Sequence, residues 1–208
     1  HTGRSFNHNI HSVRVLDKIF PLNLTLQTLV GIAGHNGEIE LAEYRPVPME
    51  SFEQFEAELE KCYTIPGYSN KIQPSTLEGN VVRVADIIAY LGKDRQDAKK
   101  AGLIEKEEEV FDMGVIGRVN AEIINNLSVN IIEHSYGKPY IKMSPEYFEA
   151  LKSAKRTNYE KIYLTPEVAD PQAKVIKPMF IRLYDRLEKD LKEWNKESPI
   201  FKHHIDPI

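Results

Sequence analysis

Apolar residues recur at steps of three and four along most of this 208-residue chain, which is the period of a helix with one buried face. In the first such segment, over residues 9–20, Ile10, Val13 and Leu16 share one face before Pro21 ends the helix. The same pattern predicts further helices near residues 22–34, 75–100, 114–134, 145–163 and 173–196. No segment shows the period-two alternation of a half-buried strand. We therefore expect an all-α, multi-helix bundle with little or no sheet.

Helix-start signals support this reading. Ser51 with Gln54 and Ser75 with Glu78 resemble capping boxes, in which a hydroxyl and a side chain three residues later satisfy free backbone N–H groups. Ser144 and Thr165 each precede a proline, which suits the first position of a helix. Gly102 stands where the helix that begins near Ser75 is expected to end.

Composition is that of an ordinary soluble domain, and its net charge of −4 gives no overall basic field for nucleic acid. The single cysteine, Cys62, forms no internal disulfide, so we expect a reducing, cytoplasmic setting.

No repeat of fixed period is present, and residues 1–208 are predicted to form a single helical domain. The charged run at 105–109 is expected to be a solvated turn of helix. Because His1 replaces an initiator methionine, we expect either a removed tag or a start within a longer protein.

Asp86 is the residue that most suggests chemistry. It stands among valines, isoleucines and alanines, and a carboxylate in such surroundings is costly unless its charge is compensated. A metal ion is one compensating partner, and Arg83, three residues earlier, is the structural alternative. Tyr90 and Asp94 follow at steps of four, so the three side chains form a polar ladder on one helix face. The alternative is a packed tyrosine and a solvated Asp94.

The histidines form a second candidate group. His8 and His11 are three residues apart, so one helix face could present both to a metal or to phosphate. A polar helix start is the competing explanation. Elsewhere, Lys152, Lys155 and Arg156 are interleaved with tyrosines, which is compatible with single-stranded nucleic acid or with an ion-paired surface. Phosphate loops, CxxC pairs and HExxH motifs are absent from the sequence.

Three segments together resemble the dGTPase-like deoxynucleoside triphosphate triphosphohydrolases of the HD superfamily. They are SFNHNIHSVRVL at residues 5–16, followed by LNLT at 22–25; VADIIAY at 84–90, with Asp94; and NYEKIY at 158–163. They occur in the family's order and with similar spacing. The resemblance covers most of the chain and corresponds to the C-terminal part of such an enzyme.

The resemblance implies an all-helical enzyme that removes triphosphate from a dNTP and leaves the deoxynucleoside. It assigns Asp86 as the last ligand of a divalent transition metal, with manganese, iron or nickel more natural than magnesium. It places His8 near the phosphates as the catalytic histidine, and Tyr90 and Asp94 at the deoxyribose. Asn9 and Arg14 match positions that line the site, and His35 is a candidate phosphate contact.

This sequence also departs from the family pattern. It contains no His-Asp dipeptide, and the family's other metal ligands would precede His1. Gly34 occupies a place where many members carry a phosphate-contacting lysine, and His35 is its possible substitute. Because one aspartate cannot fix an ion with useful affinity, we expect the chain alone to be inactive and to need the missing HD segment.

Three hypotheses follow from the sequence. The first is a dNTP triphosphohydrolase for the parent protein, to which this chain supplies Asp86 and the residues that line the sugar and phosphates. The second is an inactive, nucleotide-sensing HD-like module. The third is a single-stranded nucleic-acid binder that uses the face from Lys152 to Tyr163. A homo-oligomer is expected, because the resemblance implies assembly and a fragment of a helical bundle leaves apolar faces to be covered.

Overall fold

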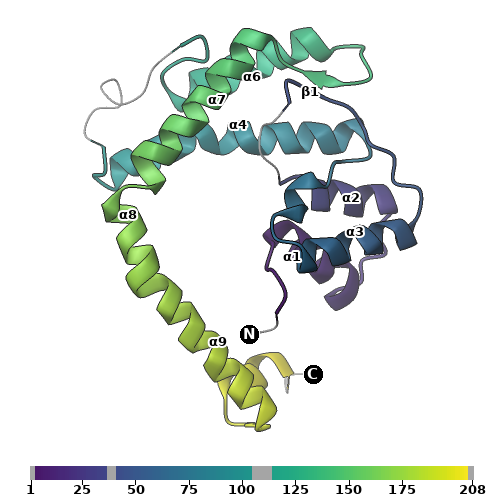
Figure 1. Ribbon diagram of the computed structural model, residues 1–208, viewed down its shortest axis with the longest axis vertical. Helices are drawn as coiled ribbons and strands as arrows, with labels where there is room; N and C mark the ends of the chain where they lie inside the picture. Colours follow the sequence, from purple (N-terminus) through teal and green to yellow (C-terminus); the bar gives the residue numbers. More distant parts are fainter. Residues whose placement is uncertain (1–2, 37–40, 105–113, 206–208) are drawn as a thin grey trace. The chain divides into compact units, whose positions relative to one another are not determined.

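The computed structural model describes residues 3–36, 41–104 and 114–205, which are mostly helical (Figure 1). The acidic run predicted at 105–109 lies outside these residues. The chain divides after Asn158 into two compact units, residues 1–158 and 159–208, which are described here one at a time. The all-α class predicted from the sequence is confirmed. The expectation of a single domain stays a prediction.

The first helices of unit 1 are short and enclose their own core. Helix α1 spans His8–Arg14 and continues as a π-helical turn, Val15–Ile19. Helix α2 spans Leu26–Gly34, and α3 spans Phe52–Thr64 before a 3₁₀ turn at Tyr68–Lys71. The side chains buried between them are Ile10, Val13, Leu29, Val30, Ala33, Phe55, Leu59, Cys62 and Ile72.

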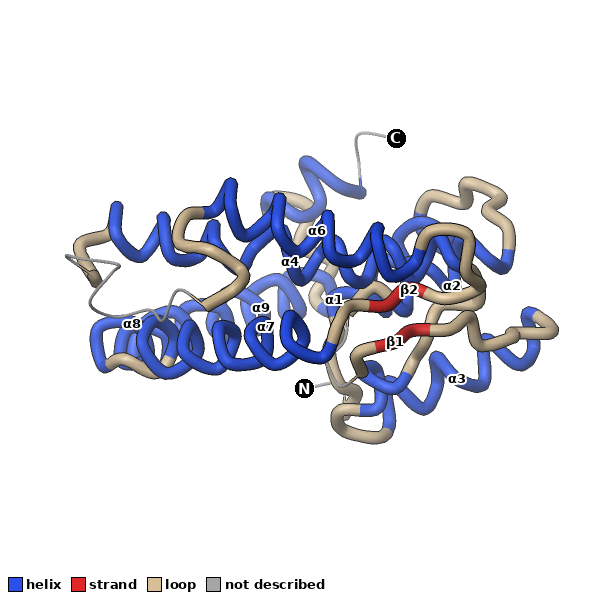
Figure 2. The backbone as a smooth tube through the Cα atoms, turned by 90° about the horizontal axis from the view of Figure 1, so that it is seen from above, coloured by secondary structure: helices blue, strands red, loops and turns tan. Residues whose placement is uncertain are grey.

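Longer helices build the second core of unit 1. Helix α4 spans Leu77–Lys100, α6 spans Asn120–Ser135 and α7 spans Pro145–Asn158. The short strands β1, Glu43–Tyr44, and β2, Ile141–Lys142, lie side by side and pair antiparallel (Figure 2). Asn158 joins α7 to α4, because its side chain donates to the Leu91 carbonyl at 2.8 Å and accepts from Arg95 Nε at 2.9 Å. The packed residues include Val84, Ile87, Ile88, Leu91, Ile116, Ile123, Leu127, Met143 and Leu151.

Unit 2 consists of short helical segments around one longer helix. A π-helical turn at Tyr159–Tyr163 precedes α8, Pro166–Pro171, and a second such turn, Gln172–Ile176, leads into α9, Lys177–Lys192. A last π-helical turn spans Phe201–Ile205. Asp190 is buried near the end of α9 and accepts from Asn195 at 2.8 Å and Arg186 at 3.0 Å. These two hydrogen bonds hold the pKa of its carboxyl below the ordinary value.

Several predicted helix boundaries needed correction. Helix α2 begins at Leu26 rather than residue 22, because Asn23 has a φ of 53° and Thr25 caps the helix through Thr28 N–H. Helix α6 begins at Asn120 rather than Gly114, because Gly117 has a φ of 96°, which a helix does not accommodate. Helix α4 is capped by Thr76 rather than by Ser75. Among the described residues, no helix is both long and apolar enough to cross a membrane.

Candidate functional site

A hollow of about 510 Å³, here called the α1–α2–α4 hollow, lies in unit 1 between α1, α2 and the start of α4, and most of its exposed lining is apolar. Its volume falls in the range of about 300–1,000 Å³ that is usual for small-molecule sites. Hydroxyl, amide and imidazole groups in this lining can hydrogen-bond a sugar or a phosphate, whereas the Glu78 carboxylate can accept from a sugar hydroxyl but repels phosphate. The lining residues are Ser12, Gln27, Thr28, Gly31, Ile32, His35, Thr76, Glu78, Gly79 and Val82.

The ends of two helices shape this hollow. Thr25 caps α2, and its hydroxyl lies 3.0 Å from that of Thr28, which faces the hollow. Thr76 caps α4 by accepting from Gly79 N–H at 3.1 Å. Because both caps use short polar side chains, the helix ends present hydroxyl groups beside the hollow rather than apolar ones.

His8 and His35 meet near one end of this region. Their Nε2 atoms are 3.3 Å apart, and their rings lie edge to face with centroids 5.3 Å apart. His35 Nδ1 lies 2.7 Å from the Ile32 carbonyl oxygen, so this nitrogen carries a proton and donates it. The structure thus brings together two predicted site residues from different helices.

His11 does not share this site. Its ring packs at 5.3 Å from that of Phe6, and both side chains are exposed. The sequence hypothesis that paired His8 with His11 is therefore replaced by the pair His8 and His35. The correct partner is 27 residues away along the chain, so helical spacing alone could not identify it.

Asp86 is not the buried carboxylate that its apolar neighbours suggested, and this expectation was wrong. Its side chain is exposed on α4, as are those of Val82 and Ala85 beside it. In the described part of the chain it does not pair with Arg83, which is buried and donates to the carbonyl oxygens of Gly34 and Ile72. Burial therefore gives no argument for a metal at Asp86, and its role as a ligand stays a prediction.

Asp86 does lie close to the hollow along α4. Val82 lines the hollow, and Asp86 follows it by four residues on the same side of the helix. Tyr90, 36% exposed, and the partly buried Asp94 continue the ladder predicted from the sequence. The three side chains are thus placed on one accessible helix face that begins at the hollow.

Asn9 and Arg14 occupy different environments. Asn9 is fully buried, and its Nδ2 donates to the Ala33 carbonyl oxygen at 2.6 Å, so it ties α1 to α2 behind the hollow. Arg14 is exposed in the last turn of α1. In this structure Asn9 acts as a positioning residue, whereas Arg14 remains accessible.

The structure explains why glycine occupies position 34, which the sequence did not reveal. A Cβ atom at this position would stand 2.9 Å from the Pro74 ring and backbone nitrogen. The close approach of α2 to the segment before α4 therefore requires glycine.

The described residues do not hold a complete metal site. No three histidine, cysteine, aspartate or glutamate side chains converge anywhere in residues 3–36, 41–104 and 114–205. A single exposed carboxylate does not bind a transition metal with useful affinity. The ion implied by the family resemblance therefore does not fit the residues present here by themselves.

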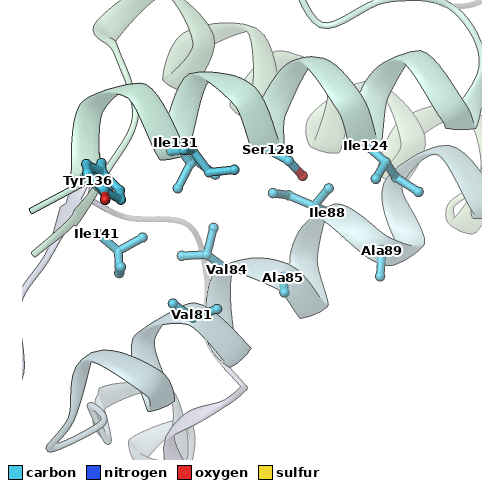
Figure 3. Close-up of a pocket in the computed structure, with 12 residues that line it drawn as sticks. Val81, Val84, Ala85, Ile88, Ala89, Ile124, Ser128, Ile131, Tyr136 and Ile141 are labelled. Atoms are coloured by element: carbon cyan, nitrogen blue, oxygen red, sulfur yellow. The ribbon is translucent and has the colours of Figure 1, made fainter.

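A second hollow, of about 450 Å³, lies between α4 and α6 and is almost entirely apolar (Figure 3). Val81, Ala85 and Ala89 line it from α4, and Ile124 and Ser128 from α6. The hydroxyl of Ser135, which also lines it, already bonds with the backbone of Lys142. Such a lining suits an apolar ligand surface rather than the chemistry of phosphate.

The basic and aromatic segment from Lys152 to Tyr163 crosses the boundary between the two units. Lys152 lies over the Phe148 ring at 5.1 Å and pairs with Glu149, whereas Tyr159 and Tyr163 contact each other in unit 2. No continuous face can therefore be described, and nucleic-acid binding stays a prediction.

Sequence reasoning missed several polar residues that line the α1–α2–α4 hollow. Ser12, Gln27, Thr28 and Thr76 were not singled out, although all four lie in or next to segments that were. Thr25 carried a usable signal, because a threonine directly before an apolar run is a favoured helix N-cap. Their convergence with α4 depends on tertiary packing, which local patterns do not encode.

The chain is similar to several curated proteins named deoxyguanosinetriphosphate triphosphohydrolase-like protein. The one from Caldanaerobacter subterraneus is 30% identical over 66% of this chain and 42% of the relative. Those from Clostridium tetani and Desulfatibacillum aliphaticivorans are 28% and 26% identical over 97% and 94% of this chain. The molecule is thus an all-helical homologue of dGTPase-like proteins. The resemblance inferred from its motifs is confirmed.

The chain spans about half the length of the curated relatives it matches, with 42%, 52% and 51% of these three covered. No family model matches the sequence, and no solved structure matches it. The activity of a whole protein of this kind is therefore considered below as a proposal.

Proposed function

We propose that this chain supplies part of the active site of a dNTP triphosphohydrolase that acts on dGTP or a similar nucleotide. The α1–α2–α4 hollow, which begins one turn of α4 before Asp86, is the observation that carries the proposal, because hydroxyl, amide and imidazole groups line it and Asp86 is an accessible carboxylate. The names of the relatives support the same reaction class.

The reaction splits the bond between the 5′-oxygen of the deoxynucleoside and its α-phosphorus. Water supplies the hydroxyl that stays on the triphosphate and the proton that the 5′-oxygen takes up. Negative charge on the phosphates must be offset throughout. We assign this task in part to a divalent metal, to which Asp86 would contribute one carboxylate and other polypeptide the remaining ligands.

The other residues of the chain would bind and orient the nucleotide. Thr28 offers a hydroxyl group to the phosphates, whereas the Ser12 hydroxyl already donates to the His8 carbonyl oxygen at 2.9 Å. Tyr90 and Asp94 offer hydrogen bonds to the deoxyribose. His35 contacts a phosphate oxygen as a donor only in its doubly protonated form, because its Nδ1 proton is committed to the Ile32 carbonyl. His8 retains the more accessible ring and is the candidate catalytic histidine.

The test is a product assay on the complete gene product with dGTP and Mn²⁺. We expect deoxyguanosine and triphosphate to form in equal amounts, and Asp86→Ala to reduce the rate at least about 100-fold. Asp97→Ala is the matched control, because Asp97 is an exposed aspartate of the same helix that pairs with Lys93. Equal activity of the Asp86→Ala variant and the wild type would remove Asp86 from the site.

A nucleotide-sensing module is the second candidate function. It is favoured by one observation, the lack of a converging set of three metal ligands in the described part of the chain. The same assay separates the two candidates. Binding of dGTP without release of triphosphate, at every divalent metal tried, would favour the sensor over the enzyme.

A further inference from the structure

The two imidazole rings of His8 and His35 point their tip nitrogens at each other from adjacent helices. His8 begins α1, and His35 follows the last residue of α2. The distance between the two Nε2 atoms is 3.3 Å. A neutral His–His hydrogen bond gives such an approach, and so do two nitrogens arranged around one metal ion.

The proton positions distinguish the roles of the two rings. His35 Nδ1 must carry a proton, because a carbonyl oxygen, that of Ile32, lies 2.7 Å away and can only accept. In neutral His35 the Nε2 atom therefore carries no proton, and its lone pair is directed at His8. This backbone tie on the far ring nitrogen is the arrangement that usually orients a metal-binding histidine.

The separation of the nitrogens also suits a metal. Two nitrogens bound at about 2.0–2.1 Å to a tetrahedral ion stand about 3.3–3.4 Å apart. The observed Nε2–Nε2 distance is 3.3 Å, so the spacing of the two nitrogens suits a shared ion once the rings turn their lone pairs towards it. His8 is exposed and His35 partly so, which leaves the remaining coordination positions open to water.

We propose that His8 and His35 form a two-histidine binding site for a borderline divalent metal such as Zn²⁺ or Ni²⁺. Binding moves the His8 proton from Nε2 to Nδ1, so both rings stay neutral, and water molecules leave the hydrated ion in exchange for the two nitrogens. Mg²⁺ does not compete, because it prefers oxygen ligands. The site does not include Asp86, but it uses the two histidines that the proposed function places at the phosphates, and its test does not require hydrolase activity.

Calorimetric titration of the 208-residue protein with ZnCl₂ in a non-coordinating buffer tests this site. The variants are made in a His203→Ala, His204→Ala background, because these adjacent exposed histidines could bind zinc themselves. With only two protein ligands, we expect a dissociation constant on the order of 10 µM, much weaker than that of four-ligand structural sites. His8→Ala and His35→Ala should each weaken binding at least about 10-fold.

Three controls make the result specific. His134→Ala is the matched variant, because His134 Nδ1 also lies 2.7 Å from a backbone carbonyl oxygen, that of Asn130, and its ring contacts no second histidine among residues 3–36, 41–104 and 114–205. His11→Ala tests the neighbouring histidine of α1. Asp86→Asn separates this site from the hydrolase metal. All three should bind zinc like the parent protein.

Imidazole ¹H–¹⁵N spectra supply a readout that does not depend on affinity. Before zinc is added, His35 should carry its proton on Nδ1, and zinc should shift Nε2 of both His8 and His35. Unchanged affinity in His8→Ala would overturn the proposal. So would zinc binding weaker than about 1 mM, which would leave the hydrogen bond as the only role of the pair.

Discussion

Arg83 and Asp86 lie one turn apart on α4 yet face opposite environments. Arg83 is 4% exposed, and its guanidinium donates to the carbonyl oxygens of Ile72 at 2.8 Å and Gly34 at 3.0 Å. Asp86 is exposed. Of these two charges the buried one is thus the arginine, which joins α4 to α2 and to the segment after α3.

Removal of Arg83 should therefore destabilise unit 1. Arg83→Met keeps much of the side-chain volume but removes two charge-assisted hydrogen bonds to buried carbonyl groups, and we expect a loss of about 3 kcal/mol. Urea unfolding monitored by circular dichroism measures it. Arg14→Met, at an exposed arginine, is the control and should stay within about 0.5 kcal/mol of the parent protein. A similar small effect at Arg83 would contradict this account of its role.

Substitution of Asp86, unlike that of Arg83, should have little effect on stability. Because its carboxylate is exposed, Asp86→Asn should change the free energy of unfolding by less than about 0.5 kcal/mol. The same urea titration checks this. A loss of about 2 kcal/mol or more would mean that the carboxylate has a folding role, and that lost activity in its variants could not be assigned to chemistry.

Gly34 and Gly31 form a matched pair on α2. A Cβ at Gly34 meets Pro74 at 2.9 Å, whereas a Cβ at Gly31 meets only the Cα of Gly79 at 3.9 Å. Gly34→Ala should cost about 1–3 kcal/mol through overpacking. Gly31→Ala should be neutral or stabilise the helix by up to about 1 kcal/mol, because alanine favours helices. Thermal unfolding of both variants measures these changes in stability. Equal changes in the two variants would contradict the close approach of α2 to Pro74.

Cys62 should be protected from thiol reagents. It is fully buried, and burial raises the pKa of its thiol from 9.0 to about 11. The neutral thiol is thus favoured in the folded state. The stability that this preference gives to the folded state is fully present below pH 9 and is lost as the pH rises towards 11. At pH 8, reaction with a disulfide reagent should follow unfolding of unit 1. A reaction rate like that of free cysteine in the native protein would contradict this burial.

The helical framework could be predicted from the sequence where local chemistry decides. Ser51 accepts from Gln54 N–H at the start of α3, and α4 ends at Lys100 with Gly102 at a φ of 71°, both as the pattern indicated. The sequence pattern predicted the starts of α2 and α6 too early, because Asn23 and Gly117 adopt positive φ angles that hydrophobic periodicity does not show.

The candidate site was less predictable for a tertiary reason. The apolar neighbours of Asp86 predicted burial, but Val81 and Val82 are about half exposed, at 50% and 54%. A pattern shows that a helix face is apolar and not whether another element covers it. Likewise, the meeting of His8 with His35 depends on how α1 packs against α2. The resemblance identified individual residues that local physics could not place.

Nucleotide binding by the α1–α2–α4 hollow is the central claim, and calorimetric titration of the 208-residue protein with dGTP tests it most directly. We predict one-to-one binding that Thr28→Val, which removes a hydroxyl group from the hollow, weakens at least about fivefold. Ser128→Ala, in the apolar hollow between α4 and α6, should leave the affinity unchanged. Absence of dGTP binding, or equal affinity in the wild type and Thr28→Val, would contradict the account.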